Sequence, residues 1–79
     1  MTLNELRIGQ HGRIVNVEGS DGIAIRLLEM GLTEGEDISV IAFAPLGDPI
    51  EFLVRGYRLS LRKTEAMRVT VEAVNERDE

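Results

Sequence analysis

Hydrophobic and polar residues alternate with a period of two through most of the second half of the chain. The alternation runs through four segments, at residues 38–44, 50–55, 57–62 and 67–73. A period of two places successive side chains on opposite faces of a β-strand. Three of the four segments have one apolar and one polar face, which favours antiparallel strands packed over a single core.

The first part of the chain predicts a helical turn and one more strand. Thr2, followed by Glu5 three residues later, fits a capping box for one turn over "TLNEL". Residues 12–19 (GRIVNVEG) predict a strand between glycines. Because Ile14 faces away from Val15 and Val17, we expect a bulge or burial on both faces of this strand.

A helical period appears only at residues 20–32, "SDGIAIRLLEMGL". Ser20 is the expected N-cap, and Gly31 is the expected left-handed residue at the helix end. The apolar positions recur at helical spacing and form one stripe of a short helix. They are Ile23, Ala24, Leu27, Leu28 and Met30.

Three short motifs connect these elements. "RGY" at 55–57 predicts a tight hairpin, "KTEA" at 63–66 a single helical turn, and "APLGDP" at 44–49 a stiff loop. Together the pattern predicts a mainly β fold, namely a small SH3-like, partly open barrel of about five antiparallel strands with one inserted short α-helix. We expect one domain over residues 1–75 and a disordered tail over 76–79.

Composition narrows the classes of function. The chain has 79 residues, a net charge of −5 and no cysteine. An acidic chain is a poor general binder of nucleic acid, and a chain without cysteine has no disulfide or thiolate metal site. With no Trp, one Tyr and two Phe, it also lacks the aromatic groove that binds proline-rich peptides. No catalytic motif is present, so we expect a protein that is not an enzyme.

Two local features point to weaker alternatives. Arg55, Arg58, Arg62 and Arg68 fall on outward faces and form a local basic patch, but only Tyr57 could stack on a base. We therefore expect no nucleic-acid partner. His11 is the only histidine, so we expect no tightly bound cofactor and at most a weak site for iron or another divalent transition metal.

The chain contains no segment that predicts export or membrane insertion. The N-terminus has no apolar signal region, and the longest apolar stretch, "ISVIAFAPL", is far shorter than the ~20 residues that span a bilayer. We expect a cytoplasmic protein that does not insert directly into the membrane, and that is a monomer or a weak homo-oligomer.

Residues 26–71 closely resemble the ferrous iron transport protein A (FeoA) family. The resemblance lies in "RLLEMGL" at 26–32, glycine at 35, "APLGDPI" at 44–50, "RGYRLSLRK" at 55–63 and "EA" at 65–66. The resemblance implies an SH3-like domain that acts beside the ferrous iron permease, a membrane protein with a GTP-binding domain. It implies binding and modulation of that permease. The alternative is a stand-alone metal-responsive module related to the C-terminal domain of iron-dependent repressors, with weak transition-metal binding.

The expected contact elements are the stiff loop, the adjoining hairpin and the end of the helix. A rigid loop loses little entropy on binding, and methionine adapts to varied interfaces. Ile41, Phe43 and Leu53 lie on the nominally outward face, and coverage by the helix is favoured over an exposed patch. The expected partner-binding residues are Met30, Leu32, Pro45, Leu46, Asp48, Pro49, Leu53, Arg55, Tyr57 and Arg58.

Overall fold

The computed structural model describes residues 1–74 and contains five strands and three short helices. In chain order these are the 3-10 helix η1 (Leu3–Glu5), β1 (His11–Val17), α1 (Gly22–Glu29), β2 (Asp37–Phe43), β3 (Ile50–Val54), β4 (Tyr57–Leu61), α2 (Lys63–Ala66) and β5 (Val69–Val74). Residue 75, the end of the expected domain, and the expected tail at 76–79 lie outside the described residues. Within residues 1–74, no helix has the length and hydropathy that crossing a bilayer requires.

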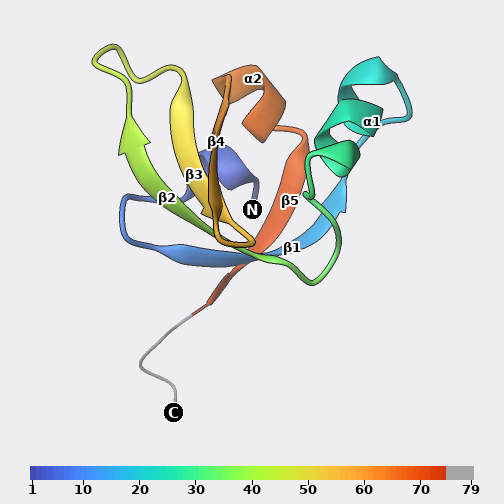
Figure 1. The fold of residues 1–79 in the computed structure, drawn as a ribbon, viewed down its shortest axis with the longest axis horizontal. Helices are drawn as coiled ribbons and strands as arrows, with labels where there is room; N and C mark the ends of the chain where they lie inside the picture. The colour runs from blue at the N-terminus through green and yellow to red at the C-terminus, as the bar shows by residue number, and fades with distance from the viewer. Residues whose placement is uncertain (75–79) are drawn as a thin grey trace.

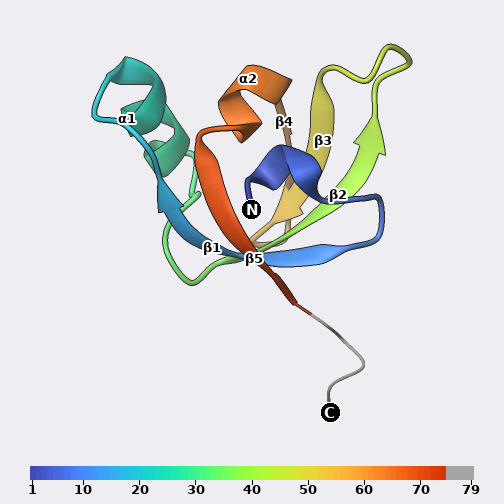
Figure 2. The same ribbon diagram turned by 180° about the vertical axis from the view of Figure 1, so that it is seen from behind.

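The five strands form one antiparallel sheet in the order β4-β3-β2-β1-β5. The sheet curls around η1, α2 links the edge strands β4 and β5, and α1 lies to one side (Figures 1 and 2). This confirms the predicted mainly β, SH3-like architecture with a helix inserted after the first strand.

The core fills the concave side of the sheet. Phe52 of β3 is completely buried among aliphatic residues from all five strands, η1 and both α-helices. No polar side chain is buried among the described residues. Burial of apolar surface therefore provides the main stabilisation, as expected for a small domain without disulfides.

Two β-bulges, one in β1 and one in β2, change which side chains face outward. The pairing of β1 with β5 shifts between Ile14 and Asn16, which confirms the expected bulge. A second shift, between Val40 and Ala42 of β2, was not expected. It places Ala42 opposite Glu51 and Phe43 opposite the buried Ile50, and Phe43, at the end of the strand, is still 38% exposed.

The buried side of helix α1 is narrower than the apolar stripe in its sequence. Ala24 and Leu27 are buried, whereas Ile23 and Leu28 are 40% and 45% exposed. Only one side of the helix meets the body of the protein, because α1 lies beside the sheet and not across it (Figure 1). It therefore does not cover Leu53, which is also 40% exposed, and the expectation that the helix covers this outward face is wrong.

The ends of α1 are fixed by local hydrogen bonds. Asp21, and not the predicted Ser20, is the N-cap, because its carboxylate accepts a hydrogen bond from the Ala24 N–H at 3.2 Å. Gly31 follows the helix with a φ of +101°, which confirms the predicted left-handed C-terminal glycine.

The short turns match their predictions. The Glu5 carboxylate accepts a hydrogen bond from the Thr2 N–H at 2.7 Å, as a capping box requires. "KTEA" forms α2, and Arg55 and Gly56 form the tight turn between β3 and β4, both with positive φ.

Candidate functional site

A groove of about 690 Å³ opens between α1, β4, α2 and the loop that joins β2 to β3. Its size is within the range of pockets that bind ligands or anchor side chains. We call it the α1–β4 groove. It is lined by Arg26, Met30, Asp48, Pro49, Ser60, Leu61, Arg62 and Glu65.

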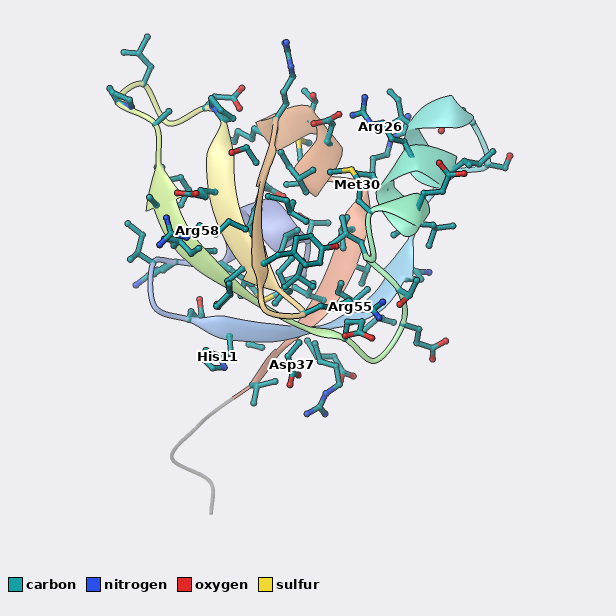
Figure 3. All side chains as sticks on the ribbon, viewed as in Figure 1. His11, Arg26, Met30, Asp37, Arg55 and Arg58 are labelled. Atoms are coloured by element: carbon teal, nitrogen blue, oxygen red, sulfur yellow. The ribbon has the colours of Figure 1, made fainter. Side chains whose placement is uncertain are left out.

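The α1 wall of the groove is held in place by Tyr57. The Tyr57 hydroxyl donates a hydrogen bond to the carbonyl oxygen of Met30, one of the carbonyls that a helix end leaves without a helical partner. A Cβ added to Gly31 would lie 2.6 Å from the Tyr57 hydroxyl oxygen. Glycine at position 31 therefore permits both the positive φ and the close approach of Tyr57. Together these contacts fix Met30 at the rim (Figure 3).

An ion pair joins the two helices across the groove. The Arg26 guanidinium of α1 pairs with the Glu65 carboxylate of α2. The same carboxylate accepts a hydrogen bond from the Arg62 N–H at 2.8 Å, so Glu65 also closes the first turn of α2.

The loop between β2 and β3 forms the third wall. Asp48 accepts a hydrogen bond from the Lys63 N–H at 2.9 Å, which ties the loop to α2. Within the loop, Gly47 has a φ of +88°, which glycine adopts without strain, and its N–H donates to the Ala44 carbonyl at 2.7 Å. At the tip, Leu46 is 97% exposed.

Among the described residues, one cationic and one anionic side chain of the groove have no ion-pair partner, namely Arg62 and Asp48. Glu65 is neutralised by the ion pair with Arg26, whereas Asp48 accepts a hydrogen bond from the Lys63 backbone N–H. Within residues 1–74, no ion pair to the exposed Arg62 guanidinium is seen. The floor is apolar, with Leu61 and Pro49. Such a site fits an apolar group that carries a carboxylate beside it.

The structure gathers some of the predicted partner-binding residues and separates others. Met30, Asp48 and Pro49 line the α1–β4 groove, and Tyr57 positions its wall. Pro45 and Leu46 lie in the loop beside it. Leu32 is completely buried in the core, so the prediction that it contacts a partner is wrong.

Leu53, Arg55 and Arg58 lie away from the groove. Leu53 and Arg55 line a separate shallow pocket with His11 and Asp37, and Arg58 is on the other side of the hairpin from Arg26 (Figure 3). Arg55 lies 4.0 Å from Glu36, and Arg58 lies 3.9 Å from Glu51. The two arginines are exposed and the two glutamates are half-buried, and ion pairs with such access to solvent contribute little to stability.

Sequence patterns did not identify five of the groove residues as site residues. These are Arg26, Ser60, Leu61, Arg62 and Glu65. Glu65 had a usable signal, because a carboxylate at the third position of a short helix predicts a capping contact. The Arg26–Glu65 pair had none, since 39 positions separate the two residues.

A metal site is not apparent in the described part of the chain. No group of three or more His, Cys, Asp or Glu side chains there could hold a metal ion. His11 and Asp37 share the shallow pocket on the far side of the sheet. Two such ligands would give at most weak binding of a transition metal.

Residues 1–73 match the model of the FeoA domain family. Over 75 residues the chain is 40% identical to the Fe(2+) transport protein A/Fe(2+) transporter FeoB fusion protein of Porphyromonas gingivalis. The match covers 95% of this chain and 9% of the fusion protein, so the chain spans less than a tenth of that curated relative.

Solved structures show the same similarity. Iron(II) transport protein A from Clostridium thermocellum is 39% identical with a TM-score of 0.89, over 94% of this chain and 46% of that one. FeoA of Stenotrophomonas maltophilia, complexed with zinc and described as a procaryotic SH3 domain protein, is 37% identical with a TM-score of 0.81. That match covers 91% of this chain and 89% of the other. A manganese-dependent transcriptional repressor is 17% identical with a TM-score of 0.84, which shows a shared fold alone.

Proposed function

Because the chain belongs to the FeoA family, we propose that it is an accessory protein of ferrous iron uptake that binds the ferrous iron permease by protein–protein contact. The observation that carries this proposal is the relative in Porphyromonas gingivalis, in which a transport protein A segment and an Fe(2+) transporter form one polypeptide. Fusion keeps two proteins at a high effective concentration, which is useful when they act together. We place the chain in the cytoplasm, beside the permease.

The α1–β4 groove is the proposed contact surface. It combines an apolar floor, an open cationic rim at Arg62 and a rigid neighbouring loop with Leu46 at its tip. Apolar pockets with few polar groups are favourable anchor sites in interfaces. A preformed groove also costs little ordering entropy on binding.

The proposed role involves no chemical step. A module that binds one conformation of a permease more tightly than another shifts the population toward the conformation that it prefers. Iron is then the cargo of the permease and not a resident cofactor of this chain.

The alternative is a stand-alone metal-responsive module, and one observation favours it: the relative from Stenotrophomonas maltophilia was obtained with zinc. In this chain the proposed weak site is His11 with Asp37. Calorimetric titration of the wild-type chain and of His11→Ala with Zn²⁺ separates the two functions. The alternative requires binding that is lost in the variant.

The test of the proposed function compares two substitutions on α1. Met30 lines the groove, whereas Ile25 is 51% exposed and does not line it. We expect Met30→Gln to weaken binding to the detergent-solubilised permease by about tenfold or more, because groove anchors carry most of the binding energy. Ile25→Gln should bind like the wild type.

Iron uptake by cells that lack the wild-type chain gives the functional readout. We expect the Ile25→Gln chain to restore uptake and the Met30→Gln chain to restore it poorly. Melting temperatures of both variants serve as the folding control. A wild-type chain that neither binds the permease nor changes uptake would refute the proposed function.

A further inference from the structure

Strand β4 is an edge of the sheet, and its free side lies along the α1–β4 groove. It pairs with β3 on one side, and no second strand pairs with it among the described residues. Ser60 and Leu61 of β4 line the groove directly. An unpaired edge presents a row of N–H and C=O groups that can accept another strand.

The hairpin geometry identifies the free backbone groups. Arg55 and Gly56 both have positive φ, so the turn is of the two-residue type in which the flanking pair, Val54 and Tyr57, is hydrogen-bonded. Hydrogen-bonded and non-hydrogen-bonded pairs then alternate along the ladder. The N–H and C=O groups of Arg58 and Ser60 therefore point away from β3.

These four backbone groups have no other partner in the described structure. Turn, loop and cap hydrogen bonds within residues 1–74 include none to the backbone of Arg58 or Ser60. The open stretch is bounded on both sides. Tyr57 is bonded to the Met30 carbonyl at one end, and α2 begins at Lys63 at the other. The edge can therefore accept a short strand of a few residues.

The side chains along this edge specify the chemistry of such a strand. Arg58, Ser60 and Arg62 alternate with Leu59 and Leu61, and Leu61 forms part of the apolar floor. Figure 3 shows Arg58 on the side of the hairpin opposite to Arg26 and Met30. A strand beside β4 thus meets Arg58 and Arg62 on one face, with Arg62 also at the rim of the groove, and the apolar Leu59 and Leu61 on the other. Arg58 lies 3.9 Å from Glu51 of β3, so Arg62 is the cation of this face without an ion pair among the described residues.

We propose that the β4 edge binds, by strand addition, an extended partner segment in which acidic residues alternate with aliphatic ones. The acidic residues lie beside Arg58 and Arg62, and the aliphatic residues enter the α1–β4 groove. Main-chain hydrogen bonds supply affinity and the alternating side chains supply specificity in this mode of recognition. The inference rests on the proposed function, because it specifies how that same groove takes its partner.

A second copy of the chain is the poorer occupant of this edge. In an antiparallel pair of two β4 strands centred on Ser60, Arg58 of each copy would face Arg62 of the other. Like charges directly opposite each other destabilise a strand pair. The acidic net charge of −5 does not oppose an acidic partner at close range, because charges farther away than ~8 Å are largely screened at physiological salt.

The test uses the full chain and two peptides of alternating pattern. The acidic probe is Thr-Glu-Val-Thr-Val-Glu-Thr, and the basic control has lysine in place of each glutamate. Amide-resolved hydrogen exchange is measured with and without each peptide. In the free chain we expect fast exchange at Arg58 and Ser60 and slow exchange at Leu59 and Leu61. The acidic probe should slow exchange at Arg58 and Ser60 by about tenfold or more. When the probe occupies the β4 edge of nearly all molecules, their N–H groups are hydrogen-bonded and protected from exchange.

Two substitutions separate the backbone contribution from the charge contribution. Ser60→Pro removes an outward N–H that takes no part in the ladder with β3, and proline is tolerated at strand edges. It should abolish protection at Arg58. Arg62→Glu should weaken peptide binding by about tenfold, whereas Arg7→Glu, an equal charge change elsewhere on the exposed surface, should leave binding unchanged.

The outcomes separate this inference from the proposed function. Failure of the acidic probe at millimolar concentration to protect Arg58 and Ser60 overturns strand addition, as does equal protection by the basic peptide. Protection already present in the free chain together with dimerisation also overturns it, since the occupant is then a second copy. If the chain binds the acidic probe but not the permease, strand addition at the β4 edge is supported and the proposed function is refuted.

Discussion

Asp21 joins the start of α1 to the segment before β5. Its carboxylate accepts a hydrogen bond from the Ala24 N–H and two from the Arg68 guanidinium, at 2.9 and 2.8 Å. Hydrogen bonding to Arg68, followed by that to Ala24, holds the pKa of Asp21 well below its ordinary value, and the pKa of Arg68 is raised in turn. Bidentate contacts of this kind fix geometry as well as charge.

The lowered pKa of Asp21 predicts a pH dependence of stability. A carboxyl group with a depressed folded-state pKa stabilises the fold above its unfolded pKa of about 3.9, and this contribution is lost as the pH falls toward the folded value. Asp21→Asn keeps a capping side chain but removes the charge. We expect its melting temperature to lie below that of the wild type at pH 7 and to approach it near pH 2.

Asp21→Ala is the matched variant, because it removes the cap as well as the charge. Its deficit should exceed that of Asp21→Asn at pH 2, where the charge contribution of Asp21 has decreased. Equal deficits of Asp21→Asn at both pH values in thermal denaturation would show that the ion pair with Arg68 adds no stability.

At the scale of elements, α1 depends on a few attachments. Its buried stripe is limited to Ala24 and Leu27, and polar contacts at Asp21, Arg26 and the Met30 carbonyl connect it to distant segments. An element with few buried apolar contacts belongs to the less stable part of a fold. The width of the α1–β4 groove therefore depends on these polar contacts.

The contact between Tyr57 and Gly31 gives a test of this dependence. Tyr57→Phe removes one hydrogen bond and should cost about 0.5–1.5 kcal/mol of unfolding free energy. Gly31→Ala adds a Cβ at a positive φ and against the Tyr57 hydroxyl, and should cost about 1–3 kcal/mol. Urea denaturation measures both changes.

The double variant with both Tyr57→Phe and Gly31→Ala completes a double-mutant cycle and shows whether the two residues interact. Because Phe at position 57 has no hydroxyl to meet the new Cβ, the double variant should lose less stability than the sum of the two single variants. Strict additivity would mean that the two residues do not interact.

The elements whose signals are local could be predicted from the sequence. Period-two alternation identified the strands, and glycines and a carboxylate three residues on identified the turn and the helix ends. The bulge in β2 could not be predicted, because an extra residue in a strand leaves no mark in an apolar run such as "ISVIAFA". Asp21, and not Ser20, is the N-cap, and its carboxylate is also paired with Arg68. A partner so distant in the sequence could not be predicted.

The candidate site could be predicted only in part, because some of its residues have local signals in the sequence and others are brought together by long-range contacts. The rigid loop and the helix end are marked by prolines, glycines and a methionine near one another in the sequence. The groove between them requires α2 to lie against α1 and the loop, and the contacts that do this are Arg26–Glu65 and Asp48–Lys63. Long-range pairs of this kind have no periodic pattern in a single sequence.

At the scale of the whole molecule, the surface features that suit a partner occur together. The open edge of β4, the α1–β4 groove and the loop with Leu46 are adjacent, because Asp48 and Pro49 of that loop and Ser60 of β4 line the same groove. The pocket that contains His11 and Asp37 lies elsewhere (Figure 3). One compact surface therefore accounts for the proposed contact with the permease.

The measurement that tests this account most directly is an amide-resolved NMR titration of the chain with the full-length permease in lipid nanodiscs. All signals of a small protein lose intensity when it joins a large assembly, and those of the contacting residues lose the most. The account predicts losses concentrated at Met30, at residues 46–48 and at residues 58–65, with His11 and Asp37 keeping their relative intensity. Intensities that stay unchanged, or losses centred on His11 and Asp37, would contradict it.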